Sequence, residues 1–334
     1  MNESPSEIVA ALRRLGLLAA DEIADLTALP GGVSSDIWRV DLATGPVCVK
    51  RALAKLKVEV EWRAPVTRNA AEVAWFEVAG RVAPGSAPEI LAHDPLGGLF
   101  VMQYLDPATH PLWKDELHAG RADPGFAARV AERLIDIHKA TAGDPAIAEA
   151  FANDDTFHAI RLEPYLEATA RVHSDHKDAL TALVETTAAT KHALVHGDVS
   201  PKNILVSPQG PVFLDAECAW YGDPAFDLAF CLNHMLLKCL WTPDATERFL
   251  ACFDSLAGTY LAGVGWESTS GLEARTAHLL PGLFLGRVDG KSPVEYLTLE
   301  ADKDRVRRVA RALLRDPVDE LAAVRDAWAR ELAS

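Results

Sequence analysis

Residues 194–206, LVHGDVSPKNILV, place three polar side chains between two short apolar runs. Asp198 follows His196 by two residues, and Asn203 follows Asp198 by five. The next apolar run ends in FLDAE, so we expect Asp215 beside Asp198 and Asn203 at the ends of neighbouring strands. One carboxylate that orients a hydroxyl, with an asparagine and a second carboxylate that hold Mg²⁺, suits phosphoryl transfer. Taken alone, the pattern is equally compatible with Asx-turns at the ends of a hairpin.

Features upstream of this stretch add a possible phosphate-binding site. The segment GGVSSD lies between predicted strands, where small residues let backbone N–H groups approach phosphate oxygens. Its candidate phosphate contacts are Gly31, Gly32, Ser34 and Ser35. Lys50 ends the alternating strand VCVK, and Glu72 on the following helix can pair with it. Each feature is weak alone, being compatible with an ordinary turn, a surface lysine or a solvated glutamate. Their order along the chain is nevertheless that of a kinase-type site.

The length and element pattern predict an α+β fold of two lobes. A chain of 334 residues exceeds one ordinary core. Residues 1–105 contain a predicted N-terminal helix that starts near Ser4, strands at 29–51, a helix at 69–83 and a hairpin at 89–105, typical of a small antiparallel lobe. Residues 106–334 are mostly helical. In this larger lobe we expect helices at 126–141 and 178–190, a hairpin of NILV and VFLD within 194–215, and further helices from about 225.

Composition disfavours several classes of partner. The net charge is −15 and no block of Lys or Arg occurs, which argues against nucleic acid as a partner. No run of about 20 apolar residues is free of charge, so a membrane span is not expected, and residues 226–241 are interpreted as a buried helix. The N-terminus has no basic leader of the kind that precedes a secretory signal. The five cysteines have no CxxC spacing, which favours reduced core thiols and a cytoplasmic location.

The combined motifs resemble the aminoglycoside phosphotransferase/choline kinase family, the small-molecule branch of the protein-kinase-like fold. HGDVSPKN is similar to the family's catalytic loop, and FLDAECAWYGDPAFDLAF is similar to its metal-binding strand and the helix beyond, with the likeness spanning roughly residues 29–240. This resemblance implies ATP and Mg²⁺ as cofactors, and transfer of phosphate to the hydroxyl of a small-molecule acceptor.

The same resemblance implies roles for individual residues. Asp198 is the implied catalytic base, Asn203 and Asp215 are the implied metal ligands, and Lys50 holds phosphates. His196 braces the catalytic loop and Asp227 supports it structurally. The linker VMQYL would receive the adenine near Gln103 and Leu105.

Three alternatives concern the acceptor and the activity. Only eleven residues separate Asp215 from Asp227, too few for the peptide-holding segment of a protein kinase, so a small acceptor is favoured. A catalytically silent nucleotide-binding module is the second alternative, opposed by the presence of Asp198, Asn203 and Asp215 together.

Glu217, two residues after Asp215 on the same strand, would point the same way and meet the same Mg²⁺. This DxE pattern resembles methylthioribose kinases and favours a sugar-like acceptor, whereas Asn203 follows the aminoglycoside pattern.

One further motif imitates a nucleotide-binding loop. GRVDGKS, at residues 286–292, resembles a P-loop but has three residues between its glycines where the motif requires four. We interpret it instead as a loop near the acceptor, in which Arg287 contacts a polar substrate; a surface arginine is the equally favoured alternative.

Overall fold

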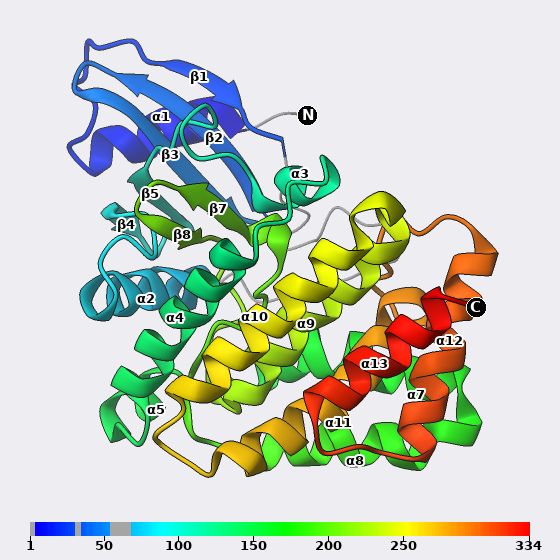
Figure 1. Ribbon diagram of the computed structural model, residues 1–334. Coiled ribbons are helices and arrows are strands. Elements are labelled where there is room, and N and C mark those ends of the chain that lie inside the picture. The colour runs from blue at the N-terminus through cyan, green and yellow to red at the C-terminus, as the bar shows by residue number, and fades with distance from the viewer. Residues whose placement is uncertain (1–3, 31–34, 54–67) are drawn as a thin grey trace.

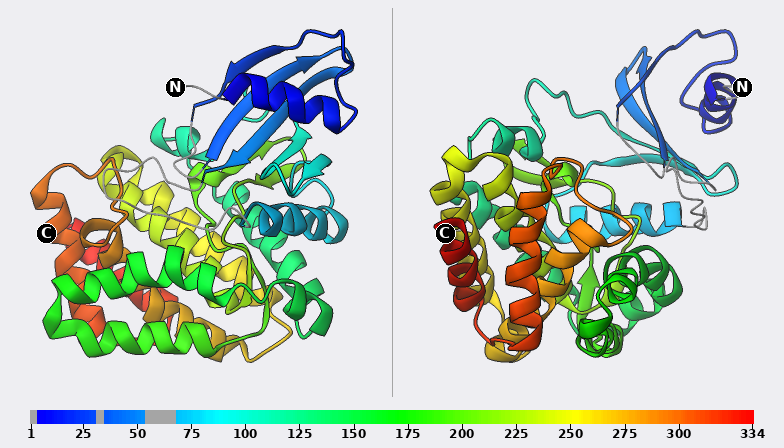
Figure 2. Two further views of the ribbon diagram at one scale, coloured as in Figure 1. Left: turned by 180° about the vertical axis from the view of Figure 1, so that it is seen from behind. Right: turned by 90° about the vertical axis from the view of Figure 1, so that its right-hand side faces the viewer.

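The computed structural model describes residues 4–30, 35–53 and 68–334. Its N-terminal lobe is built around a five-stranded antiparallel sheet in the order β1-β2-β3-β5-β4. The elements of this lobe are α1 (Ser4–Arg14), β1 (Asp25–Ala28), β2 (Ser35–Leu42), β3 (Gly45–Ala52), α2 (Arg68–Val82), β4 (Ile90–Asp94) and β5 (Leu99–Gln103). Figures 1 and 2 show α1 lying across the outer face of the sheet, with α2 nearer the helical lobe.

The two faces of the sheet serve different purposes because side chains alternate along a strand. Val47 and Val49 of β3 face outward and pack in one apolar cluster with Ile8 and Leu12 of α1. Cys48, one position along, belongs to the main core cluster instead. Alternation therefore directs the next inward position of β3, residue 50, toward α2 and the helical lobe.

The C-terminal lobe is mostly helical, with two small two-stranded sheets, of which the β7–β8 hairpin lies next to the N-terminal sheet (Figure 1). Its helices are α3 (Trp113–His118), α4 (Pro124–Thr141), α5 (Pro145–Ala150), α6 (Asp154–Phe157), α7 (Ala168–Val172), α8 (Lys177–Ala189), α9 (Pro224–Trp241), α10 (Thr246–Gly263), α11 (Thr269–Asp289), α12 (Glu300–Arg315) and α13 (Leu321–Leu332), with a π-helix, η1 (His158–Glu167), and short 3₁₀ turns η2 (Ser174–His176), η3 (Pro201–Asn203) and η4 (Pro243–Ala245). Its strands are β6 (Ala193–Val195), β7 (Ile204–Ser207), β8 (Gly210–Phe213) and β9 (Trp220–Gly222). Strand β6 pairs with β9, and β7 pairs with β8.

Helix α9 is the central element of this lobe. It is buried on nearly all sides and mostly apolar, which is the pattern of a helix enclosed by others. It packs between α10 and α11 and also contacts β6, and Asp227 in its first turn accepts hydrogen bonds from the loop after β6. Residues near its start are therefore held rigidly beside the loop that follows β6.

The predicted two-lobed α+β fold is confirmed, and most predicted elements lie within two residues of their observed bounds. Two strands were not predicted, β1 and β9, which are short and carry little periodicity. All five cysteines are buried free thiols, as expected. No helix in the described ranges is long and apolar enough to cross a membrane.

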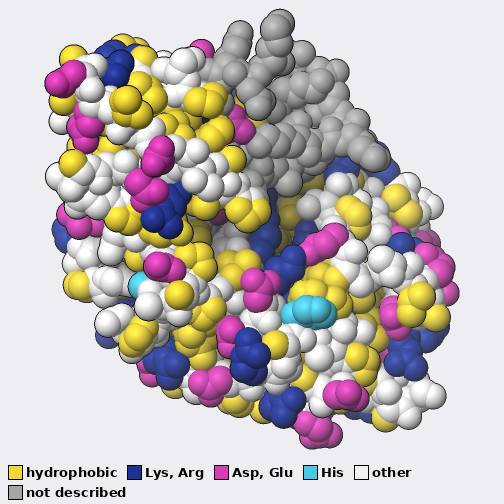
Figure 3. Space-filling view, turned by 90° about the horizontal axis from the view of Figure 1, so that it is seen from above, with side chains coloured by type: hydrophobic (Ala, Val, Ile, Leu, Met, Phe, Trp, Pro, Cys, Tyr) yellow, Lys and Arg dark blue, Asp and Glu magenta, His cyan; other side chains and the backbone are white. Residues whose placement is uncertain are grey.

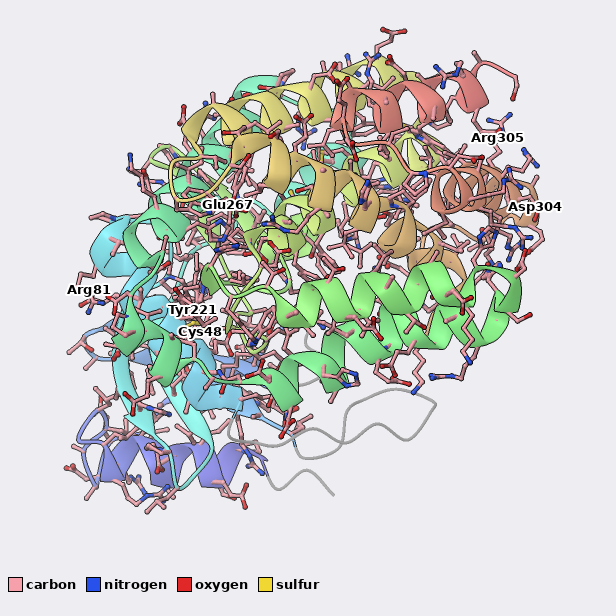
Figure 4. The ribbon with its side chains drawn as sticks, turned by 90° about the horizontal axis from the view of Figure 1, so that it is seen from below. Cys48, Arg81, Tyr221, Glu267, Asp304 and Arg305 are labelled. Carbon is pink, nitrogen blue, oxygen red and sulfur yellow. The ribbon has the colours of Figure 1, made fainter. Side chains whose placement is uncertain are left out.

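The charged side chains of α12 lie far from the sheet. Figure 4 shows Asp304 and Arg305 at one end of the helical lobe, while Cys48 of β3 lies in the interior at the opposite side of the molecule. Asp304 is engaged by Arg307 of the same helix at 2.7 Å. The electrostatics of the junction between the lobes are therefore set by other residues.

Candidate active site

Lys50 lies at the junction between the lobes, where the alternation of β3 directs it. Its Nζ donates to Oε1 of Glu72 on α2 at 2.8 Å and also contacts Oδ1 of Asp215. Burial would lower the pKa of Lys50, but Asp215 and Glu72 together raise it above its usual value. Burial raises the pKa of Glu72 to about 7, an effect that Lys50 opposes. The ammonium is thus held in one position by carboxylates from two lobes, and the predicted contact between Lys50 and Glu72 is present.

Asp215 has an unusual backbone. Its φ of 66° makes it the one non-glycine residue with positive φ in the described part of the chain. Aspartate tolerates this left-handed conformation better than most residues, and such strain is concentrated at functional sites. Its carboxylate remains 26% exposed while contacting Lys50. Burial would raise the pKa of Asp215, but Lys50 and Lys202 lower it below the usual range, so the group is a partly exposed anion.

The loop after β6 is organised by Asp227 of α9. Both oxygens of this fully buried carboxylate accept backbone N–H groups, from His196 at 2.7 Å and from Gly197 at 2.8 Å. Gly197 has a φ of 79°, and a Cβ there would lie 2.8 Å from the carbonyl oxygen of Cys218. The loop therefore requires glycine before Asp198 for both its backbone conformation and its packing.

His196 connects this loop to the segment that carries Asp215. The backbone N–H of Asp198 donates to Nδ1 of His196 at 3.1 Å, so Nδ1 is an acceptor and the proton lies on Nε2. Nε2 then donates to the carbonyl oxygen of Leu214 at 3.1 Å. Burial lowers the pKa of His196, which keeps this neutral tautomer. The imidazole thus links the Asp198 loop to Leu214 by hydrogen bonds, and its bracing role stays a prediction.

Asp198 is buried and ionised. Its Oδ2 accepts from Nη2 of Arg161 at 2.9 Å and lies 3.3 Å from Nζ of Lys202. Burial would raise the pKa of Asp198, but Lys202 and Arg161 lower it below the usual range. Its other oxygen, Oδ1, is buried without a hydrogen-bond partner. An anionic oxygen that is fixed in place and unpartnered can accept a proton or hydrogen bond from a bound hydroxyl.

Asn203 lies between Asp198 and Asp215 along the chain and near both in space. Its Nδ2 donates to the carbonyl oxygen of Asp198 at 3.1 Å, and its own carbonyl oxygen accepts from the N–H of Leu214 at 2.8 Å. The amide nitrogen is thus occupied, and the side-chain oxygen is the atom that a hard cation prefers. Mg²⁺ is commonly held by one or two carboxylates together with substrate phosphates. The side chains of Asp215 and Asn203 fit that requirement. No group of three His, Cys, Asp or Glu side chains that could hold a metal ion is found in the described residues.

Residues 25–269, more than two thirds of the chain, match the phosphotransferase enzyme family designated APH. The chain belongs to this phosphotransferase family. It is 26% identical to the methylthioribose kinase of Yersinia enterocolitica over 69% of this chain, and 28% identical to that of Pectobacterium carotovorum over 68%. The chain spans 62% of the length of each of these relatives.

Solved structures show the fold shared by this phosphotransferase. The ethanolamine kinase of Plasmodium vivax matches with a TM-score of 0.60 at 12% identity, covering 94% of this chain and 89% of that one. An amicoumacin kinase, solved in complex with AMP-PNP and Ca²⁺, matches with a TM-score of 0.56 at 15% identity, covering 95% and 98%. The resemblance inferred from the sequence motifs is thereby confirmed at the level of family and fold.

Three further nucleotide-site candidates of the phosphotransferase lie in the described residues, at the sheet or just after it. Ser35 is buried at the start of β2. Gly31, Gly32 and Ser34 lie outside the described residues. Gln103 ends β5 and is exposed, with its backbone N–H bonded to the carbonyl of Glu89 at 2.9 Å. Leu105 follows on the half-buried linker that leads into the helical lobe.

The expected geometry of Glu217 is wrong. Strand β8 ends at Phe213, so Asp215 and Glu217 are not strand neighbours that point the same way. The positive φ of Asp215 turns the chain between them. Oε2 of Glu217 accepts from Nε of Arg68 on α2 at 2.8 Å. In the observed arrangement Glu217 is an ion-pair partner that ties the two lobes together, and its metal role stays a prediction.

The expected surroundings of Arg287 are also wrong. Residues 286–289 form the last turn of α11 and are no loop, because the helix continues to Asp289. Arg287 is 6% exposed, so it is not a surface arginine either. Its Nη1 donates to the hydroxyl of Tyr165 at 3.2 Å and to Oγ of Ser292 at 3.2 Å. The predicted contact with substrate stays a prediction.

Two residues that contact Asp198, Arg161 and Lys202, were not predicted from the sequence motifs. Arg161 lies in η1, a π-helix interrupted by Pro164, and donates to the carbonyl of Gly197 as well as to Asp198. Its segment, HAIRLEPYLE, has no motif that indicates a site. Lys202, by contrast, lies within the quoted loop four residues after Asp198, and that spacing was an available signal.

Proposed function

We propose that this phosphotransferase transfers the γ-phosphate of ATP to a hydroxyl of a small molecule. The observation that carries this proposal is the convergence of Lys50, Asp215 and Asp198 at one junction, with Lys50 bridging two carboxylates and Asp198 presenting an unpartnered oxygen.

The nucleotide would lie between the sheet and the loops of the helical lobe. Lys50, fixed by Glu72, would contact its phosphates. The glycine-rich segment with Gly31, Gly32, Ser34 and Ser35 would cover them, and the linker at Gln103 and Leu105 would receive the adenine. The complex of the amicoumacin kinase relative with AMP-PNP supports a nucleotide in this fold.

Asp215 and Asn203 would hold Mg²⁺, and Glu217 is a third candidate ligand only after release from Arg68. When bound, the ion neutralises charge on the transferring phosphate. The protein's own contribution is to keep Asp215 ionised through Lys50 and Lys202 and to direct its carboxylate into the cleft through the left-handed backbone.

Asp198 would act on the acceptor. Its free Oδ1 orients the hydroxyl and takes the proton as the acceptor oxygen bonds to the γ-phosphorus. The bond from that phosphorus to the bridging oxygen breaks, and ADP leaves with the electron pair. Arg161 and Lys202 hold the carboxylate by its other oxygen, so the reacting oxygen keeps its position.

A small acceptor is favoured over a protein by the segment between Asp215 and Asp227. Those residues form a buried turn and β9, which pairs with β6 inside the helical lobe. This leaves no extended surface segment to hold a peptide. The five buried thiols support the proposal that the protein acts in the cytoplasm.

The test is ATP turnover measured across a panel of sugars, amino alcohols, aminoglycosides and a generic protein substrate. Phosphorylation of at least one small molecule, and none of the protein, is expected. Binding of Mg·ADP without turnover on any acceptor would favour the catalytically silent nucleotide-binding module. Phosphorylation of the generic protein substrate, and of no small molecule, would indicate a protein kinase instead.

A further inference from the structure

One face of α9 leads away from the proposed base. Phe230, His234 and Lys238 are spaced four residues apart and so lie along the same side of the helix. The ring of Phe230 lies 5.9 Å from the guanidinium of Arg161, which holds Asp198, and 5.6 Å from the ring of His234. This face therefore begins beside the base and ends at Lys238.

Lys238 is an unusual buried cation. It is 1% exposed, and its Nζ lies over the rings of Trp241 at 4.4 Å and Tyr296 at 4.8 Å. No hydrogen bond or ion pair to its ammonium is found in the described ranges. Cation–π contacts offset only part of the cost of burying an ammonium. Lys238 therefore lacks the anionic partner that a buried lysine normally has.

Neighbouring side chains present further unpartnered polar atoms. Nε2 of His234, Nε of Arg287 and the hydroxyl of Tyr296 are all buried without hydrogen-bond partners. Arg287 bonds only to Tyr165 and Ser292 among the described residues, so it too has no carboxylate partner there. Native proteins leave few buried donors unpaired, and several at one place point to a missing acceptor.

The positive local charge indicates that the missing hydrogen-bond acceptor is an anion. Asp198 is already paired with Arg161 and Lys202. The carboxylates that act on Lys238 are Glu295, which is paired with Lys114, and Asp115, so the cations Lys238, Arg287 and Lys114 still outnumber them. Figure 3 shows a hollow at the junction of the lobes, lined by hydrophobic side chains and by Lys and Arg side chains, with Asp and Glu side chains at its rim. A cationic acceptor, such as an amino alcohol or an aminoglycoside, would be repelled there, whereas an oxyanion supplies lone pairs to several donors at once.

We propose that the acceptor of this phosphotransferase carries an oxyanion, a carboxylate or a phosphate, that binds to Lys238 and Arg287 while its hydroxyl lies at Asp198. The inference rests on the proposed function, since it assigns the chemical class of the acceptor at that same site. It separates this chain from kinases named for choline or ethanolamine, whose acceptors are cations.

The test is binding to the full chain loaded with Mg·ADP, so that phosphate-binding groups of the nucleotide site are already filled. The probes share one skeleton and differ in charge: glucose 6-phosphate, glucuronate, glucose and glucosamine, with inorganic phosphate as the minimal anion. Titration calorimetry is expected to show saturable binding of the phosphate or carboxylate probes and weaker binding of glucosamine. Which of the two anions binds more tightly distinguishes a phosphate from a carboxylate.

Lys238→Met supplies the decisive variant, because methionine has a similar shape and no charge. It should weaken binding of the anionic probes at least about tenfold, the value of one charge-assisted hydrogen bond. Lys238→Arg should restore part of that loss. The matched control is Lys191→Met, since Lys191 also lies over a tryptophan ring, that of Trp220 at 3.9 Å, but is paired with Asp154 on the surface.

The outcomes separate the two proposals. Failure of the wild-type chain to bind Mg·ADP overturns the proposed function itself. Normal Mg·ADP binding with no anion binding, with preference for glucosamine, or with equal anion binding by wild type and Lys238→Met, overturns the oxyanion inference and leaves the kinase proposal standing.

Discussion

Lys50 shows how one side chain depends on its partners. Lys50→Met removes the phosphate contact and should lower kcat/KM by about 10²–10³. Glu72→Gln should cost less, because Asp215 still holds the ammonium. Both changes disrupt the same Lys50–Glu72 ion pair. The fold loss of kcat/KM in the double variant should therefore be much smaller than the product of the two single losses.

The control for this cycle is Glu77→Gln, on the same helix but exposed. It should leave turnover nearly unchanged. Strictly additive effects of Lys50→Met and Glu72→Gln would mean that the observed ion pair plays no part in nucleotide binding.

Asp198 should matter for the transfer step alone. Asp198→Asn keeps a hydrogen-bond acceptor for Arg161 but removes the basic oxygen, so turnover should fall by about 10²–10⁴. The Kd for Mg·ADP should stay within a factor of about two, because the proposed contact is with the acceptor. Near-normal turnover in this variant would show that Asp198 is not the base.

Lys238 should make anion binding depend on pH. Burial lowers the pKa of Lys238 to about 7, assisted by Lys114 and Arg287 and opposed by Glu295 and Asp115. The ammonium is charged below that pH and neutral above it. Affinity for the anionic probes should therefore be highest below pH 7 and fall as pH rises further, whereas Lys238→Met should lack this component.

The same pKa shift affects stability with a defined sign. Between about pH 7 and the usual lysine value of 10.5, the unfolded chain binds the proton that folded Lys238 has lost. The free energy of unfolding of wild type, relative to Lys238→Met, should thus rise with pH through this window. Urea unfolding at several pH values measures it, and a falling difference would contradict the assigned pKa.

At the scale of elements, the loop between β6 and α9 depends on glycine. Gly197→Ala must adopt a positive φ, which costs about 1–2 kcal/mol, and its Cβ would also press on the backbone of Cys218. Gly143→Ala is the matched control, because Gly143 has a φ of 69° with open space around its missing Cβ. Urea unfolding should show a clearly larger loss for Gly197→Ala. Equal losses would mean that the loop moves to accommodate the methyl group.

Sequence reasoning succeeded where local patterns determine the element. The order of elements in a kinase-type site, with Lys50 ending an alternating strand and Glu72 on the following helix, was enough to predict the contact between them. It failed at Glu217 because the left-handed backbone of Asp215 interrupts the strand, which no periodicity reveals. It failed at Arg161 because a π-helix changes which side chains share a face, and only tertiary packing brings that guanidinium to Asp198. The lobe boundary after residue 105 stays a prediction.

For the whole molecule, we expect the ion pairs across the junction to couple the lobes to ligand binding. Lys50 joins β3 to Asp215, and Arg68 joins α2 to Glu217. Mg·ATP should therefore raise the melting temperature of the entire chain, by an amount equivalent to about 2.7 kcal/mol at one hundred times its Kd.

Asp215→Asn tests this coupling, because asparagine also tolerates the left-handed backbone. The variant should lose most of the stabilisation by Mg·ATP while keeping that by metal-free ADP. Equal losses with both ligands would indicate that Asp215 is structural.

Helix α9 also fixes a length. Its Asp227 end positions the loop of the proposed base, and Lys238 lies eight residues beyond Phe230, about 12 Å along the axis at 1.5 Å per residue. Because this helix is buried and rigid, it fixes the distance between the reacting hydroxyl and the far end of the acceptor. The position of the lysine along α9 would then select acceptors by the distance between their hydroxyl and their oxyanion. Moving the lysine from position 238 back one turn to 234 would select a shorter acceptor without touching any group that binds the nucleotide.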